Sequence, residues 1–123
     1  MEKAAAVQAQ LRALFQAAQS ADVIRGAELL LYRGSQVDQH YQRPLDPSHP
    51  EEQAHLSGML GRIRDWLAQD PTPVFGETIV NPQSQGEWVA QEVIFRADSP
   101  DPLRRYFGFL FVQNAYRLGD IDQ

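Results

Sequence analysis

Apolar residues recur every three to four positions through the first half of the chain, which predicts helices there. Residues 2–19 are mostly good helix formers, and their apolar side chains share one helical face. A second helix is predicted from Asp22, a residue type that caps helix N-termini, to Gly34, a type common just past C-termini. The run 28–32 fits a short buried strand equally well, and periodicity does not decide between the two.

The segment 34–50 contains three prolines and several Asp and Ser residues, so it is predicted to be a loop without a regular element. Ser48 and Glu51 have capping-box spacing, and Glu52 adds a second acid where the helix dipole favours negative charge. A third helix is predicted to begin there and to end at Asp70. Its apolar stripe consists of Leu56, Met59, Leu60, Ile63, Trp66 and Leu67.

After position 70 the apolar period changes from 3.6 to 2, which predicts strands. Four segments rich in β-branched and aromatic residues cover 74–81, 87–98, 104–113 and 116–121, with turn-forming residues between them. We expect an antiparallel meander on which the helices pack. The side chains expected to be largely buried include Leu14, Phe15, Leu60, Ile63, Trp66, Phe109 and Phe111.

This order of elements predicts one α+β domain over residues 1–123, with three N-terminal helices packed on a curved, four-stranded antiparallel sheet. A hydrophobic content of 43% and a charged content of 22% are typical of globular chains. The net charge of −5 provides no basic field for a phosphate backbone, so we expect no nucleic-acid partner.

Cysteine is absent, which excludes disulfides and thiolate chemistry and leaves the redox compartment open. No apolar stretch approaches the roughly 18 residues of a membrane span. We therefore expect a soluble protein, cytoplasmic as written, or exported if a targeting segment has been removed.

Several short segments resemble a known superfamily. They are the closing hairpin 106–122 (YFGFLFVQNAYRLGDID) and the segments 27–34 (AELLLYRG), 86–88 (GEW) and 118–122 (LGDID). Together with the order of elements, they resemble small uncharacterised bacterial proteins of the nuclear transport factor 2-like (cystatin-like) superfamily, several of which are lipoproteins. The resemblance implies a cone of helices and curved sheet. It carries no catalytic residues to this chain.

The histidines do not form a metal motif. His40, His49 and His55 lie nine and six residues apart, two of them in the proline-rich segment, whereas metal sites favour spacings such as i and i+4 on a helix. We expect no metal and no cofactor. No serine stands in a nucleophile elbow, and no glycine-rich loop is present to hold a phosphate.

The densest polar cluster follows the second predicted helix and consists of Tyr32, Arg33, Asp38, His40, Tyr41 and Arg43. In the cone of the resembled superfamily, Asp38 or His40 would reach a pocket and act as a general base. A loop pinned by hydrogen bonds and an ion pair accounts for the same residues, and we favour that interpretation.

Near the C-terminus, Asp120 and Asp122 would share one face of a strand. Arg33 ends an apolar segment and needs an acidic partner, so we expect it to bond Asp120, Asp122 or Asp38. The aromatic residues Trp88, Tyr106 and Tyr116 would form either core or the wall of a ligand site.

Three functions fit this sequence. We favour a non-enzymatic binding or interaction module, with a homodimer through the exposed sheet face, a small ligand or a protein partner. The first alternative is an isomerase, cyclase or dehydratase that uses Asp38 or His40. The second is an immunity or inhibitor protein.

Overall fold

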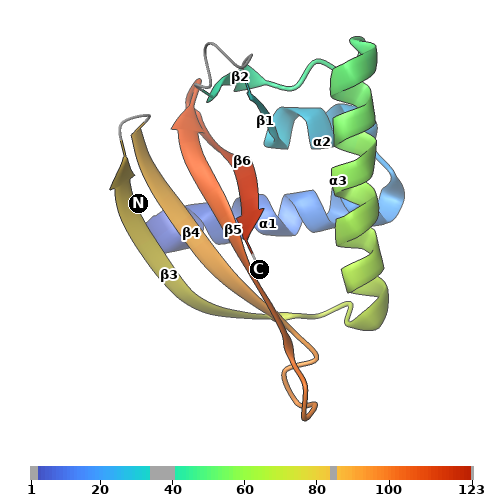
Figure 1. The fold of residues 1–123 in the computed structure, drawn as a ribbon, viewed down its shortest axis with the longest axis vertical. Helices are drawn as coiled ribbons and strands as arrows, with labels where there is room; N and C mark the ends of the chain where they lie inside the picture. Colours follow the sequence, from blue (N-terminus) through green and yellow to red (C-terminus); the bar gives the residue numbers. More distant parts are fainter. Residues whose placement is uncertain (1–2, 34–40, 84–85, 123) are drawn as a thin grey trace.

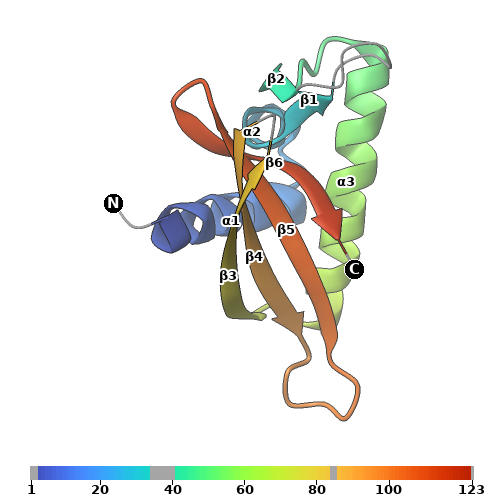
Figure 2. The ribbon, with the colours of Figure 1, turned by 60° about the vertical axis from the view of Figure 1, so that its left-hand side comes forward.

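The architecture is a helical layer on one face of an antiparallel sheet (Figures 1 and 2). The computed structural model describes residues 3–33, 41–83 and 86–122. Its helices are α1 (Lys3–Ser20), α2 (Val23–Leu29) and α3 (Pro50–Gln69). Its strands are β1 (Leu31–Arg33), β2 (Tyr41–Pro44), β3 (Val74–Gln83), β4 (Gly86–Phe95), β5 (Leu103–Val112) and β6 (Ala115–Asp122). The sheet order β3-β4-β5-β6 confirms the predicted α+β fold and meander.

Capping interactions end α1 and begin α2. Ala21 has a left-handed φ of 55°, and the N–H of Asp22 donates to the carbonyl of Ala17 at 2.9 Å, which is the pattern of a Schellman motif. Asp22 then caps α2, because its carboxylate accepts a hydrogen bond from the backbone N–H of Arg25 at 3.1 Å. The predicted start of the second helix is confirmed.

The predicted end of that helix at Gly34 is wrong. α2 stops at Leu29, and Leu30 is extended, with a parallel bridge to Leu118 of β6. Leu29, Leu30 and Leu31 are all buried, and three consecutive residues cannot share one helical face. The strand alternative for the run 28–32 therefore holds from Leu30 onward, whereas Glu28 and Leu29 belong to α2.

The loop predicted over 34–50 also contains a strand. β2 pairs antiparallel with β1, with Leu31 opposite Pro44. Pro44 ends this short pair, a position at which proline is tolerated. Residues 34–40 lie outside the described part of the chain.

The capping box predicted at Ser48 and Glu51 does not form. The cap of α3 is His49, whose side chain makes no capping bond, and Pro50 is the first helical residue, a position that proline favours. Ser48 instead donates its hydroxyl hydrogen to Asp46 at 2.6 Å. The predicted end of the helix at Asp70 is confirmed.

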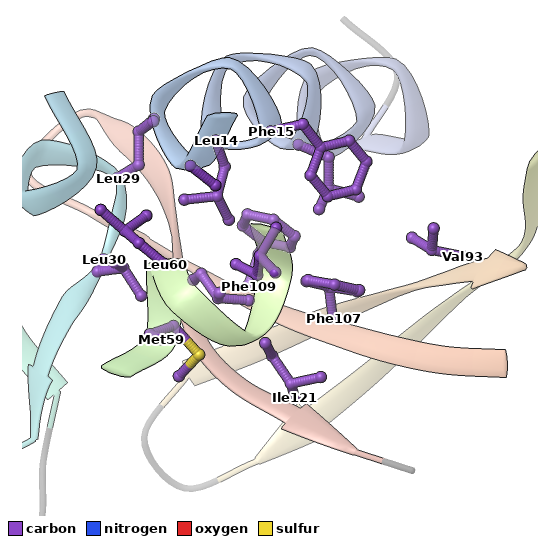
Figure 3. Close-up of a cluster of buried hydrophobic side chains, with 14 of the residues drawn as sticks. Leu14, Phe15, Leu29, Leu30, Met59, Leu60, Val93, Phe107, Phe109 and Ile121 are labelled. Atoms are coloured by element: carbon purple, nitrogen blue, oxygen red, sulfur yellow. The ribbon is translucent and has the colours of Figure 1, made fainter. Parts of the chain in front are cut away.

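The core lies between the helices and one face of the sheet, which we call the inner face (Figure 3). The ring of Phe107 on β5 meets those of Phe15 on α1 and Trp66 on α3 edge to face, with centroids 6.0 and 6.1 Å apart. Phe109 and Val93 are buried beside them. Aromatic and aliphatic side chains therefore fill the space between α1, α3 and the sheet.

One residue of the predicted core lies elsewhere, and another packs against the core without being fully buried. Phe111 is 60% exposed, because it stands near the tip of the β5–β6 hairpin, where its ring meets Tyr116 with centroids 5.1 Å apart. Trp66 is only half-buried.

The turn between β5 and β6 is a tight hairpin turn. Its two residues, Gln113 and Asn114, have positive φ angles of 52° and 66°, as a type I′ turn requires.

Each of two bulges inserts one extra residue into the sheet. Gly76 and Glu77 of β3 together oppose Glu92 of β4, and Gly119 of β6 is the extra residue opposite β5. The buried amide of Gln91 donates to the carbonyls of Gly76 and Glu77 at 3.2 and 3.3 Å. The side chain of Gln91, on the inner face, thereby supplies hydrogen bonds to both carbonyls of the bulge.

Candidate functional site

The candidate site is on the outer face of the sheet, which points away from α1 and α3. Directly opposed residues on neighbouring strands share a face, so pairing arranges them in rows. One row crosses the sheet through Ile79, Ala90, Gly108 and Asp120.

This row produces a depression in the outer face. Its two central members, Ala90 and Gly108, have the smallest side chains, while Trp88 and Tyr106 stand on either side of them along β4 and β5. The resulting hollow measures about 400 Å³. Its lining residues are Ile79, Asn81, Trp88, Ala90, Tyr106, Gly108 and Asp120.

The indole of Trp88 lies against the backbone of Gly108. A Cβ added to Gly108 would be 3.1 Å from Cε3 and 3.2 Å from Cζ3 of Trp88, which is tighter than ordinary van der Waals contact. The missing side chain at 108 therefore lets the indole lie low on the sheet and form one wall of the depression.

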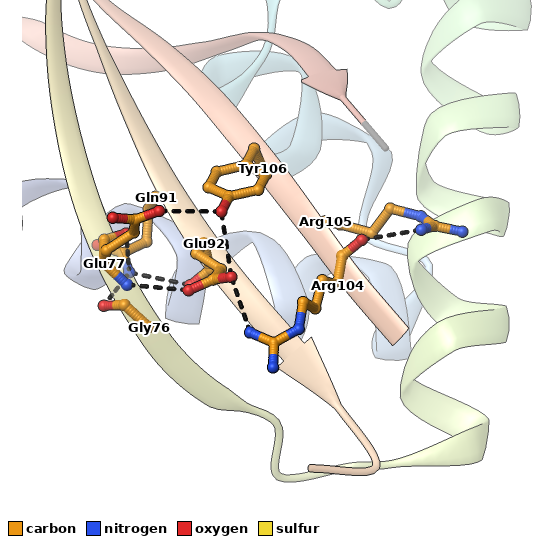
Figure 4. Close-up of polar contacts among 7 residues, drawn as sticks. All are labelled: Gly76, Glu77, Gln91, Glu92, Arg104, Arg105 and Tyr106. Carbon is orange, nitrogen blue, oxygen red and sulfur yellow. Dashed lines mark hydrogen bonds and ion pairs between the residues drawn. The ribbon is translucent and has the colours of Figure 1, made fainter. Parts of the chain in front are cut away.

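A polar network borders the depression on the side of Tyr106 (Figure 4). Glu92 is 7% exposed, and its Oε1 accepts a hydrogen bond from the backbone N–H of Glu77 at 3.1 Å. Its Oε2 accepts from Arg104 at 3.1 Å and lies 3.2 Å from the Tyr106 hydroxyl. Burial alone would raise the pKa of Glu92, but these hydrogen bonds outweigh it and hold the pKa below its ordinary value.

The Tyr106 hydroxyl lies between two carboxylates. It is 3.0 Å from Oε1 of Glu77 as well as 3.2 Å from Oε2 of Glu92. The hydrogen bond to Glu77, partial desolvation and the contact with Glu92 together raise the pKa of Tyr106 to about 12. The phenol thus stays protonated at physiological pH and gives its one hydrogen to this pair of acids.

The sequence-predicted polar cluster falls largely outside what the structure describes. Asp38 and His40 lie outside the described residues, as do the side chains of Tyr32, Arg33, Tyr41 and Asp122. The expected bond from Arg33 to an aspartate stays a prediction. Of the predicted polar residues whose side chains the structure describes, Asp120 lines the depression, together with the predicted aromatic residues Trp88 and Tyr106.

Arg43 of the predicted cluster has a structural contact. Its guanidinium forms two hydrogen bonds with the carboxylate of Glu52, at 2.8 and 3.0 Å. Glu52 is 5% exposed and also accepts from the backbone N–H of Asp46 at 2.8 Å. The pKa of Glu52 is lowered, and the hydrogen bonds from Arg43 are the largest cause. This pair fastens β2 to the first turn of α3.

Neither a metal cluster nor a membrane helix is found in the described part of the chain. Within residues 3–33, 41–83 and 86–122, no three His, Asp or Glu side chains are grouped closely enough to hold a metal ion. None of the described helices is long and apolar enough to cross a bilayer.

Sequence reasoning anticipated part of the depression. Trp88 and Tyr106 were identified as a possible ligand wall, whereas Ala90, Gly108 and Glu92 were not singled out. A glycine within a strand is the available sequence signal for Gly108, since such glycines often mark a close approach by another group.

Comparison of the chain with protein-family models, curated proteins and solved structures gives no match.

Proposed function

We propose that this chain is a non-enzymatic binding module of the nuclear transport factor 2-like fold, and that it binds a small ligand in the depression on the outer face of its sheet. Two features support the fold. The helices precede the large sheet in the sequence, and that sheet curves over the helices that pack on its inner face. An isolated parallel bridge between Leu30, which follows α2, and Leu118 of β6 brings these two distant parts of the chain together.

One observation carries the proposed function: the centre of the inner face is filled, whereas the centre of the outer face is hollowed. A hollow of about 470 Å³ on the inner side lies only at its edge, between α1 and the β5–β6 hairpin. Phe15, Trp66 and Phe107 occupy the space that a pocket between helices and sheet would need. The hollow of about 400 Å³ on the other face is within the range of small-molecule sites, and it combines apolar walls with a few polar groups.

A second copy of the chain is the competing occupant. The predicted homodimer would use the same face, where Ile79 is 41% exposed and Trp88 is half-buried. A small ligand is favoured because the centre of this face is concave, and two such faces packed together would leave a void between them. The enzyme hypothesis depends on Asp38 or His40 and stays a prediction, as does the immunity or inhibitor hypothesis.

The test is a two-dimensional NMR screen of the isotope-labelled protein against mixtures of small compounds. Binding compounds should shift the backbone amides of Ala90 and Gly108. Ala90→Leu should abolish these shifts by filling the floor, whereas the matched variant Ala54→Leu, on an exposed position of α3, should retain them.

Light scattering on the same samples reports the competing occupant. A wild-type dimer that Ala90→Leu converts to monomer would replace the ligand proposal with self-association. Compounds whose shifts cluster elsewhere, or a screen without hits at millimolar concentration, would overturn the proposal.

A further inference from the structure

The walls of the depression are aromatic. Trp88 and Tyr106 line it from two strands, and the small pair Ala90 and Gly108 forms the floor between them. The face of an aromatic ring carries negative electrostatic potential and attracts a cation within about 6 Å of its centroid.

A carboxylate completes the lining. Asp120 is exposed, and its Oδ1 accepts a hydrogen bond from the backbone N–H of Ile121 at 2.9 Å. That bond leaves the second oxygen of Asp120 without a hydrogen-bond partner among the described residues. Because of the Gly119 bulge, Asp120 pairs with Gly108 and therefore stands on the outer face.

The charge around the depression is negative. No lysine or arginine is among its lining residues in the described part of the chain. Arg104 is on the same face, but its guanidinium is bonded to Glu92. Glu77 and Glu92 share one phenol hydrogen from Tyr106, so an anionic ligand would approach an existing excess of carboxylates.

From this combination we infer that the ligand is a small organic cation of the alkylammonium class, with its charged group between the rings of Trp88 and Tyr106 and beside Asp120. The inference rests on the proposed function, because it concerns the same depression. It adds the charge and the chemical class of the ligand.

The test uses three probes of nearly equal shape and different charge. Choline is the cation, 3,3-dimethylbutan-1-ol is its neutral carbon analogue, and 3,3-dimethylbutanoate is the anion. Dissociation constants are measured from the NMR shifts of the Ala90 and Gly108 amides. Choline should bind about tenfold more tightly than the alcohol, and the anion should bind most weakly.

Asp120→Asn removes the negative charge of this side chain and keeps its shape. Asparagine keeps an oxygen to accept the N–H of Ile121, so the local backbone should be preserved. The variant should weaken choline binding by about fivefold and leave binding of the alcohol unchanged. Asp98→Asn, which removes an exposed carboxylate after β4, is the matched control and should change neither.

The outcomes of the two proposals are distinguishable. If the alcohol binds as tightly as choline, or if Asp120→Asn weakens both equally, the depression is a ligand site and the cation inference is wrong. If none of the three probes shifts Ala90 or Gly108, the cation inference is again wrong, and the compound screen decides the proposed function separately.

Discussion

The carboxylate of Glu92 occupies the space into which a side chain at Gly76 would extend. A Cβ built on Gly76 would lie 2.0 Å from Oε1 of Glu92, a separation that real Cβ atoms essentially never show. The same oxygen accepts the backbone N–H of Glu77, the second residue of the bulge. A side chain at 76 would therefore have to displace the Glu92 carboxylate from its hydrogen bonds.

Gly76→Ala should consequently destabilise the protein. Displacing the Glu92 carboxylate disrupts hydrogen bonds to a charged group, so the free energy of unfolding should fall by about 2–3 kcal/mol in urea denaturation. The control is Gly58→Ala on α3, where an added Cβ meets nothing within 4 Å. That change should raise stability by up to about 1 kcal/mol through helix propensity. Similar losses in both variants would contradict this account of Gly76.

The contact between Arg43 and Glu52 predicts a pH dependence. The folded pKa of Glu52 is below its ordinary value of 4.5, so its stabilising effect is complete above that pH and is lost as the pH falls through the folded pKa. Glu52→Gln should cost about 1.5–3 kcal/mol at pH 7 and should flatten the acid side of the stability profile. Glu51→Gln, on the exposed neighbour, is the control. An unchanged acid slope in Glu52→Gln would count against the prediction.

Ala21 adopts a conformation that glycine would adopt without cost. Its φ of 55° is left-handed, and the strain on a residue with a Cβ is about 1 kcal/mol. Ala21→Gly should therefore raise the midpoint of thermal unfolding. The same exchange at Ala54, inside α3, should lower it because glycine is a poor helix former. A lower midpoint for Ala21→Gly would show that the Schellman motif does not form.

Two phenylalanines on the same strand should respond differently to truncation. Phe109 is 1% exposed within the core, and Phe109→Ala should cost about 3–5 kcal/mol. Phe111 is 60% exposed, and Phe111→Ala should cost less than about 1 kcal/mol. Chemical denaturation of both variants measures the difference. Equal costs would mean that the hairpin tip is packed more tightly than described.

The regular elements were predictable because their patterns are local. The bounds of α1, the cap at Asp22 and the end of α3 at Asp70 follow from helix formers and capping residues. The end of α2 was not predictable in this way, because Leu30 is drawn into the sheet by Leu118, which is 88 positions away in the sequence. Phe111 fits the alternating pattern of its strand, but a pattern does not show where the covering helices end.

The candidate site was less predictable. Trp88 and Tyr106 were noticed as aromatic residues, but only the strand register places Ala90 opposite Gly108 and leaves a hollow between them. The charged cluster around Arg33 and Arg43 attracted attention through its density, whereas Arg43 serves to hold β2 on α3. Chemical character was readable from the sequence, and cross-strand proximity was not.

The bulge at Gly119 has a consequence for how the last strand tolerates changes in length. With Gly119 in place, Leu118 and Ile121 pair with Phe109 and Phe107 of the inner face, and Asp120 pairs with Gly108 of the outer face. Deleting Gly119 would leave all three on their present faces and make the strand regular. Deleting Arg117 instead, with Asp120 still paired to Gly108, would bring Leu118 opposite Leu110 on the outer face and leave Gly119 opposite Phe109 in the core. Deletion of Gly119 should therefore be tolerated better than deletion of a paired residue of this strand, because it removes no side chain from either face.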